Sequence, residues 1–164
     1  MSFSGKTVIV TGATSGIGRA AAEAFGRDGA CVVLVGRNER ALSEVAGAIS
    51  TSGGQAVTCR ADVTSDEAPA AIVAAALAAF GHIDVIVNAV NPGVTVTNLH
   101  RRSGMDDAQY AAFLERSKTT HPLGRPGQPD DIVGMILFLA SDRASWMTGE
   151  TIPIDGGRHL TCAR

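Results

Sequence analysis

The chain has 164 residues, of which 45% are hydrophobic, and a formal net charge of −2 at pH 7. This length predicts a single domain spanning residues 1–164, and the near-neutral charge argues against binding to nucleic acid or to a membrane surface. The apolar run at 68–80 contains a proline and is too short to cross a bilayer. Residues 1–6 lack the apolar segment of a signal peptide. Cys31, Cys59 and Cys162 have no metal-ligand spacing, so we expect reduced thiols, no metal site and a cytoplasmic protein.

Strand and helix patterns alternate through the first half of the chain. Strands are predicted at 7–10, 31–35, 55–59 and 83–87 from short apolar runs. Between them, apolar residues at helical spacing predict three helices. The first ends at Gly29, the second runs from an Asn38 cap to about Ser50, and the third spans 66–80. This order predicts an α/β fold, Rossmann-like and doubly wound, with a parallel sheet.

The pattern changes after Val90. The Asn91-Pro92-Gly93 break precedes a charged stretch that we expect to be a polar loop up to about Arg116. A helix is predicted at 130–140, and a last short strand at 151–154, before Asp155-Gly156-Gly157. The buried side of that helix is predicted to carry Ile132, Val133, Ile136, Leu137 and Leu139. If the final strand lies beside the fourth, the strand order is 3-2-1-4-5.

A glycine-rich turn stands between the first strand and the first helix. Its residues are Thr11-Gly12-Ala13-Thr14-Ser15-Gly16-Ile17-Gly18. In a strand–turn–helix context these glycines allow a sharp turn, a close backbone approach to phosphate, and close packing of helix against strand. The helix directs its free N–H groups at an anion. The turn therefore predicts a pyrophosphate site of a dinucleotide, with Thr11, Gly12, Ser15, Gly16, Ile17 and Gly18 as contacts.

The residues after the second strand indicate which dinucleotide is bound. A site that selects NAD commonly has a carboxylate there, which binds the ribose 2′-hydroxyl. This chain has Gly36-Arg37-Asn38 instead, so no carboxylate repels a 2′-phosphate, and Arg37 can pair with one, helped by Arg40. We therefore expect NADP(H) in preference to NAD(H), with Arg37 and Asn38 at the site.

These motifs resemble the short-chain dehydrogenase/reductase family, in particular its 3-oxoacyl-carrier-protein-reductase-like branch. The resemblance rests on the glycine turn, Asp62-Val63, Asn88-Ala89, Pro92-Gly93 with Thr97, and Asp155-Gly156-Gly157, and it covers nearly the whole chain. It implies hydride transfer between a nicotinamide cofactor and a carbonyl or alcohol. It also implies that Asp62 and Val63 bind the adenine, that Asn88 and Ala89 line the cofactor, and that Pro92, Gly93, Val94 and Thr97 flank the nicotinamide. A turn role at a strand end is the alternative for Asp62.

The catalytic residues that the resemblance implies are missing. The family uses a tyrosine as proton donor, a lysine four residues later on the same helix face, and a serine. Here Tyr110 is the single tyrosine, Leu114 stands four residues after it, and the lysines are Lys6 and Lys118. Tyr110 with Lys118 or His121 could substitute, but its loop position favours a lid or packing role. We therefore predict no catalytic residues and negligible family-type turnover.

One short stretch accounts for this loss. Val87-Asn88-Ala89 resembles the end of the family's fourth strand, and Asn88-Ala89-Val90-Asn91-Pro92-Gly93 resembles the end of its sixth. The sequence thus predicts an in-frame internal deletion that joins a cofactor-binding half, 1–89, to a C-terminal remnant, 90–164. A splice product, a truncated gene and an incorrect gene model all remain open as its origin.

The deletion has consequences for packing and for function. One sheet face would keep three helices and the other only the helix at 66–80, so we expect self-association through the exposed face and no family-type tetramer. Three functional hypotheses remain: a working reductase, a nucleotide-binding protein without turnover, and a non-functional truncated isoform that does not fold stably.

Overall fold

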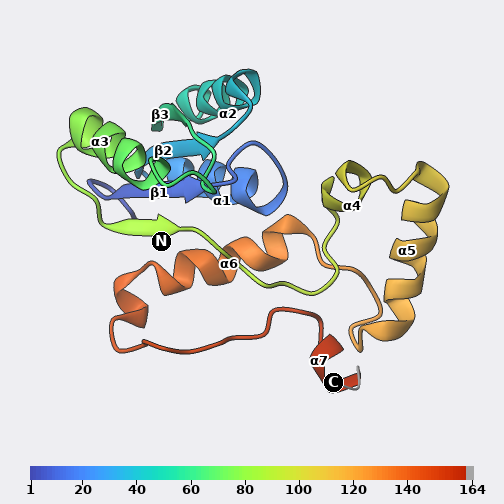
Figure 1. Ribbon diagram of the computed structural model, residues 1–164. Helices are drawn as coiled ribbons and strands as arrows, with labels where there is room; N and C mark the ends of the chain where they lie inside the picture. The colour runs from blue at the N-terminus through green and yellow to red at the C-terminus, as the bar shows by residue number, and fades with distance from the viewer. Residues whose placement is uncertain (162–164) are drawn as a thin grey trace.

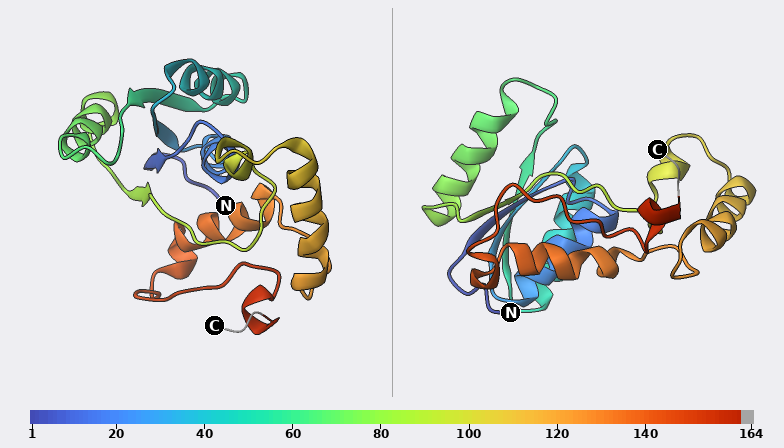
Figure 2. Two further views of the ribbon diagram at one scale, coloured as in Figure 1. Left: turned by 45° about the vertical axis from the view of Figure 1, so that its right-hand side comes forward. Right: turned by 90° about the horizontal axis from the view of Figure 1, so that it is seen from below.

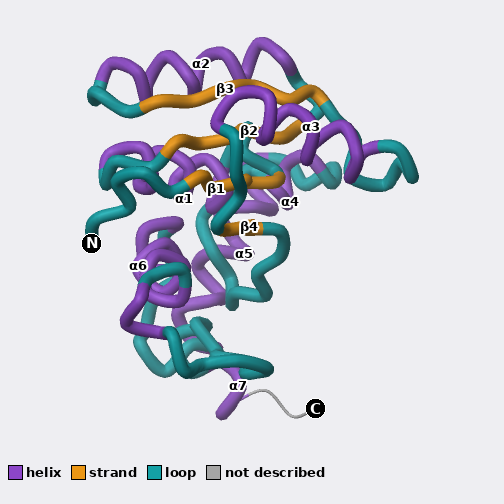
Figure 3. Tube along the Cα trace, turned by 90° about the vertical axis from the view of Figure 1, so that its left-hand side faces the viewer, coloured by secondary structure: helices purple, strands orange, loops and turns teal. Residues whose placement is uncertain are grey.

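The computed structural model describes residues 1–161 as an α/β fold built on one parallel sheet (Figure 1). Its strands are β1 (Thr7–Thr11), β2 (Cys31–Gly36), β3 (Gln55–Arg60) and β4 (Val85–Val87). They are ordered β3-β2-β1-β4, and every neighbouring pair is parallel. Figure 3 shows this order directly. The Rossmann-like α/β fold predicted from the sequence is confirmed.

The helices are distributed unequally between the two faces of the sheet. The elements outside the sheet are α1 (Gly16–Arg27), α2 (Glu39–Thr51), α3 (Ala68–Phe80), α4 (Leu99–Arg102), α5 (Asp107–Thr120), α6 (Pro129–Leu139), the 3-10 turn η1 (Asp142–Ala144) and α7 (Arg158–Thr161). The core on one face joins α1, α2 and α6 to the sheet, and the core on the other joins only α3. The predicted difference in helical cover is therefore confirmed.

The first two helices follow their sequence signals closely. Asn38 caps α2 as predicted, because its side chain accepts a hydrogen bond from the backbone N–H of Ala41 at 3.0 Å. Gly29 follows the end of α1 with φ of +93°, in the left-handed region that glycine adopts without steric cost. Local spacing and capping thus determine the start of α2 and the end of α1, whereas α3 begins at Ala68 and not at the predicted residue 66.

Residues 151–154 do not form the predicted strand. The predicted strand order 3-2-1-4-5 was therefore wrong about the fifth strand. The segment lies on the far side of α6 from the sheet (Figure 1), and its Ile154 carbonyl accepts a 3.4 Å hydrogen bond from the Gly93 N–H. A strand needs a partner along its length, whereas β4 is only three residues long. With no long edge beside it, this apolar segment packs as coil.

The prediction of a polar loop up to about Arg116 was also wrong, because this stretch forms α4 and most of α5. The start of α5 has a capping box, in which Asp106 accepts from the Gln109 N–H and Gln109 accepts from the Asp106 N–H. Figure 2 shows α4 and α5 projecting to one side of the sheet, away from α3. The Asp-x-x-Gln spacing was the sequence signal for this helix. It was not recognised, because the many charged residues around it favoured a polar loop.

The helix predicted at 130–140 is α6. Ile132, Val133 and Ile136 are buried as expected, but Leu139 is 45% exposed, which corrects its place in the predicted core. Within residues 1–161, no helix combines the length and the apolar character that crossing a membrane requires.

Candidate functional site

The glycine turn connects β1 to α1 at the carboxyl edge of the sheet. A Cβ at Gly18 would lie 2.4 Å from the backbone oxygen of Gly12, so only glycine lets the helix pack this closely against the turn. Gly12 itself has φ of +65°, and a Cβ there would meet no atom within 4 Å. The turn is thus tightly closed at Gly18 and open to solvent at Gly12.

The first turn of α1 is free of competing polar groups. Ser15 occupies the N-cap in an extended conformation, and its side chain makes no capping hydrogen bond. No acidic residue lies in the first turn, and Ile17 is partly buried against the core. The N–H groups and the positive end of the helix dipole are therefore available to an anion.

A hydrogen bond joins the end of β1 to the end of the neighbouring edge strand β4. The Thr11 hydroxyl donates to the Asn88 carbonyl at 2.9 Å and also lies 3.0 Å from the Asn88 side-chain oxygen. The structure thereby brings Thr11 and Asn88 together, as the sequence predicted for residues of one site. Ala89 follows in an exposed position beyond the strand end.

The residues expected around the adenosine are partly engaged in local structure. Asp62 accepts hydrogen bonds from the Thr64 N–H (3.1 Å) and the Thr64 hydroxyl (2.8 Å), which lower the pKa of its carboxyl. Arg37 lies 3.7 Å from this carboxylate. Val63 is 54% exposed, and the Asn38 side chain is used in capping α2. Asp62 therefore forms a local turn with Thr64, its contact with the adenine stays a prediction, and Arg37 faces solvent.

The segment from Pro92 to Thr97 is fixed to the C-terminal part of the chain at one end. A Cβ at Gly93 would lie 2.8 Å from the Asp155 Cα, and the Val94 N–H donates to the buried His121 ring at 3.2 Å. At its other end, the Thr97 side chain contacts the glycine turn, because a Cβ at Gly16 would lie 3.1 Å from it. Of the predicted nicotinamide contacts, Thr97 is thus beside the turn, whereas Gly93 is beside Asp155.

Tyr110 has a packing role. Its side chain is 4% exposed, its hydroxyl donates to the Thr97 carbonyl at 2.9 Å, and the Arg101 guanidinium lies 4.5 Å from the ring centroid. Lys118 pairs with Glu115 at 2.7 Å. The packing interpretation of Tyr110 is therefore confirmed. Its hydrogen bond holds Thr97, the residue whose side chain contacts Gly16.

Two arginines that the sequence did not point to lie beside the site. Arg60 and Arg102 line a cavity together with Arg37 and Thr14. The two are distant in the sequence and belong to no motif, so no local pattern pointed to them. Within residues 1–161, no cluster of side chains suits a metal ion, and Cys162 lies outside the described residues.

Comparison with known proteins establishes the family. The short chain dehydrogenase family model matches residues 6–119, and the model described as enoyl-(acyl carrier protein) reductase matches residues 85–159. The chain therefore belongs to the short-chain dehydrogenase family.

Individual relatives agree with this assignment. An uncharacterized oxidoreductase of Mycobacterium tuberculosis is 30% identical, over 95% of this chain and 98% of the relative. The L-rhamnose 1-dehydrogenase (NAD(P)(+)) of Azotobacter vinelandii is 29% identical, over 93% of this chain and 96% of the relative. The solved structure of L-sorbose reductase from Gluconobacter frateurii, complexed with NADPH and L-sorbose, has a TM-score of 0.88 at 21% identity and covers 99% of each chain.

The alignments also bear on the length of the chain. They run over 243 and 250 residues for the two sequence relatives, whereas this chain has 164. A large block of each relative therefore has no counterpart here. This difference is consistent with the internal deletion predicted at Asn88-Ala89.

Proposed function

We propose that this chain binds a nicotinamide dinucleotide through residues 1–89 and does not carry out the family's carbonyl reduction. The observation that carries the binding proposal is the geometry of the glycine turn. Gly18 closes the turn against α1, and Gly12 leaves open space in front of an uncapped helix terminus. A pyrophosphate fits such a turn, because it can accept hydrogen bonds from several backbone N–H groups at once.

Arg37 supports a preference for NADP(H). Its partner Asp62 lies 3.7 Å away and both side chains are largely exposed, so a phosphate can replace this weak pairing. The names of the relatives support a nicotinamide dinucleotide in general, since one is named for NAD(P)(+) and one was solved with NADPH. The preference itself rests on Arg37 and on the absence of a carboxylate immediately after β2.

The rest of the predicted contact set belongs to the same proposal. Thr11 and Asn88 lie together at the strand ends, and Thr97 touches Gly16. Ala89, Pro92, Gly93 and Val94 lie on the segment that connects these two places. With Ser15, Ile17, Asn38, Asp62 and Val63, they are the positions at which substitution should change affinity for the dinucleotide.

The proposed lack of turnover rests on the surroundings of Tyr110. Its hydroxyl donates to the Thr97 carbonyl within the protein, and the position four residues later is Leu114. A positioned proton donor typically contributes 10²–10⁴-fold to such a reaction. Residual oxidoreductase activity is the alternative, and a non-functional truncated isoform is the third possibility.

Fluorescence titration with NADPH and NADH separates these possibilities. We expect saturable binding of both, tighter for NADPH, and no oxidation of NADPH with a panel of aldehydes, ketones and ketoses. Arg37→Ala should weaken NADPH binding about 10-fold and leave NADH binding nearly unchanged. The matched control is Arg27→Ala, an exposed arginine at the end of α1. Equal affinity for both cofactors would overturn the preference, and turnover at the rate of intact relatives would overturn the proposed inactivity.

We also propose that a second copy of the chain covers the open side of β4, in place of the family-type tetramer. Ile86 is 59% exposed and lines an apolar groove between β4 and α3. Val85, Ile86 and Val87 carry neither a charge nor a proline that would protect an edge strand, and within residues 1–161 β4 pairs only with β1. Two β4 edges related by a two-fold axis present the same backbone groups to each other.

Analytical ultracentrifugation over a range of concentrations tests the association. We expect a monomer–dimer equilibrium that Ile86→Lys shifts to the monomer. Leu123→Lys, at a position that is 70% exposed after α5, should leave the equilibrium unchanged. A monomer at every concentration would contradict the proposal. The single-domain organisation and the cytoplasmic location stay predictions from the sequence.

A further inference from the structure

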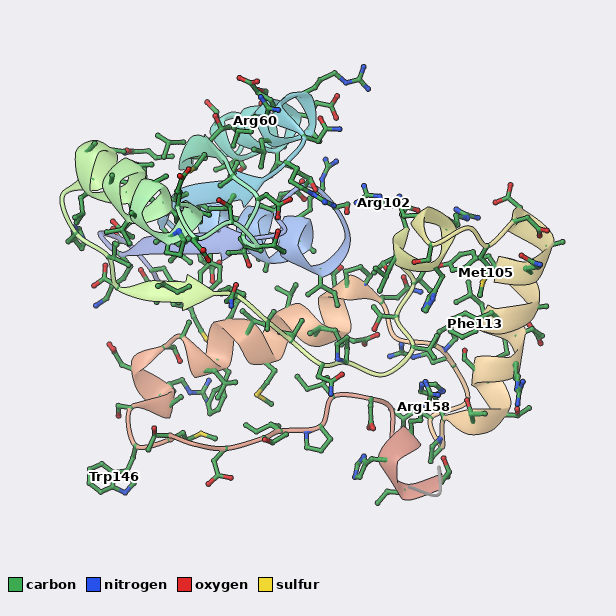
Figure 4. All side chains as sticks on the ribbon, viewed as in Figure 1. Arg60, Arg102, Met105, Phe113, Trp146 and Arg158 are labelled. Atoms are coloured by element: carbon green, nitrogen blue, oxygen red, sulfur yellow. The ribbon has the colours of Figure 1, made fainter. Side chains whose placement is uncertain are left out.

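Three arginines from separate parts of the chain line one cavity beside the glycine turn. The cavity has a volume of about 670 Å³, and its lining includes Thr14 of the turn, Arg37, Arg60 and Arg102. Arg37 follows β2, Arg60 is the last residue of β3, and Arg102 is the last residue of α4. Figure 4 labels Arg60 and Arg102 and shows Arg102 on the side of α4 that faces the N-terminal half.

The charges around this cavity favour an anion. Glu39 is the one carboxylate in its lining, against three guanidinium groups. Arg37 is paired with Asp62 at 3.7 Å, and within residues 1–161 neither Arg60 nor Arg102 forms an ion pair. A phosphate monoester carries up to two negative charges and can accept forked hydrogen bonds from several guanidinium groups, so it matches this arrangement.

The position of Arg102 is set by packing in the C-terminal segment. Thr97 rests against Gly16, and the Tyr110 hydroxyl binds the Thr97 carbonyl at 2.9 Å. The neighbouring Arg101 stacks on the Tyr110 ring and pairs with Asp107 at 3.1 Å, so it is already engaged. Successive residues of a helix point in different directions. Arg102 therefore faces the cavity while Arg101 holds α4 against α5.

We propose that Arg102 and Arg60, with Arg37, form a phosphate-monoester site, so that α4 of the C-terminal segment contributes to cofactor selection. The proposal rests on the dinucleotide binding proposed above and assigns its phosphate end. Arg102 is a specificity-determining residue here, because it binds the group that distinguishes NADPH from NADH. The C-terminal remnant thus takes part in binding the cofactor even though it lacks the family's catalytic residues.

Isothermal titration calorimetry with four ligands tests this site: NADPH, NADH, 2′,5′-ADP and 5′-AMP. We expect Arg102→Ala and Arg60→Ala each to weaken NADPH and 2′,5′-ADP about 10-fold, and to change NADH and 5′-AMP less than about 2-fold. Arg102→Lys should recover part of the loss, since it keeps the charge but not the fork. The matched control is Arg116→Ala, an exposed arginine on α5 outside the cavity, which should change none of the four affinities.

The outcomes separate this inference from the proposed function. If the parent protein binds NADPH and Arg102→Ala has no effect, or weakens NADH equally, the Arg102 site is overturned while dinucleotide binding stands. If the parent binds 2′,5′-ADP in an Arg102-dependent way but binds neither dinucleotide, the phosphate site is supported and the proposed function fails. If the parent binds none of the four ligands, both are overturned.

Discussion

Ile9 and Ile86 lie side by side in register on neighbouring parallel strands, and their environments are opposite. They are partners in the pairing of β1 with β4, so their side chains point to the same face of the sheet. Ile9 is fully buried beneath α3, whereas Ile86 is 59% exposed. The same residue type in the same conformation is therefore core in one strand and surface in the next.

The difference shows what a sheet requires of its helices. On the opposite face, Val85 and Val87 of β4 pack against the core that α1, α2 and α6 cover. On the Ile86 face, α3 reaches β1, β2 and β3, and β4 remains open. The strand forms through its pairing with β1, but it is buried only where a helix lies above it.

The largest expected effect is on the face with three helices. Phe25 of α1 is fully buried and makes an edge-to-face contact with Phe3 at 4.9 Å between ring centroids. We expect Phe25→Ala to lower the free energy of unfolding by about 3–5 kcal/mol. Urea denaturation followed by circular dichroism measures this. A loss below about 1 kcal/mol would mean that this face is not the main core.

Substituting Ile9 and Ile86 in turn tests directly the difference in burial between β1 and β4. Ile9→Ala should cost about 2–5 kcal/mol, because it leaves a cavity beneath α3. Ile86→Ala should cost under about 1 kcal/mol, since more than half of that side chain is already in solvent. Both are measured by denaturant unfolding at a protein concentration low enough to keep the chain monomeric. Equal losses would show that Ile86 is covered in solution.

The beginning of α6 predicts a dependence of stability on pH. The Arg125 guanidinium donates to both Asp131 carboxylate oxygens at 2.6 and 2.8 Å, and with the Gln128 N–H it lowers the pKa of Asp131 to about 2. An unfolded aspartate has a pKa of about 3.9, so this contribution is present above that pH and is lost as the pH falls toward 2.

The corresponding measurement compares the parent with Asp131→Asn. Unfolding midpoints in urea should fall more steeply between pH 4 and pH 2 in the parent than in the variant. Asp130→Asn, at the neighbouring position, is the control, because no ion pair of Asp130 occurs within residues 1–161. Parallel pH profiles for parent and Asp131→Asn would contradict the role of this ion pair in holding α6.

The smallest effect, and one of opposite sign, is expected at Thr7. Its hydroxyl is buried without a hydrogen-bond partner among residues 1–161, while its backbone N–H donates to Asp84 at 2.8 Å. Thr7→Val keeps the shape and removes the unsatisfied hydroxyl, so we expect a gain of up to about 1 kcal/mol. Differential scanning calorimetry detects this as a small rise in Tm. A clear fall in Tm would mean that the hydroxyl has a partner in solution.

The N-terminal half followed from local signals, and the C-terminal half followed only in part. Capping at Asn38, the end of α1 at Gly29 and the close packing of Gly18 against Gly12 each depend on neighbours within a few residues. The prediction at 151–154 depended on a distant partner strand, which β4 is too short to provide. The start of α5 had a local signal in Asp106 and Gln109, which went unrecognised among charged residues.

The residues of the candidate site likewise fall into those that local spacing predicted and those that it did not. Gly12, Gly16 and Gly18 were found from their spacing, because one continuous segment forms the turn. Arg60 and Arg102 were missed, because they come from the end of β3 and from α4 and meet only when the chain is folded. No spacing rule connects residues that share a cavity but belong to different elements.

The sequence by itself determined the alternation of strands and helices, the glycine turn and the presence of a single tyrosine without a lysine four residues later. Each is a property of residues close together in the chain, where periodicity and backbone sterics act directly. Only the tertiary structure decided that Ile86 is exposed, that 151–154 is coil and that Arg102 lies beside Arg37's cavity. These depend on which elements pack together, because burial and pairing are properties of distant contacts rather than of any one segment.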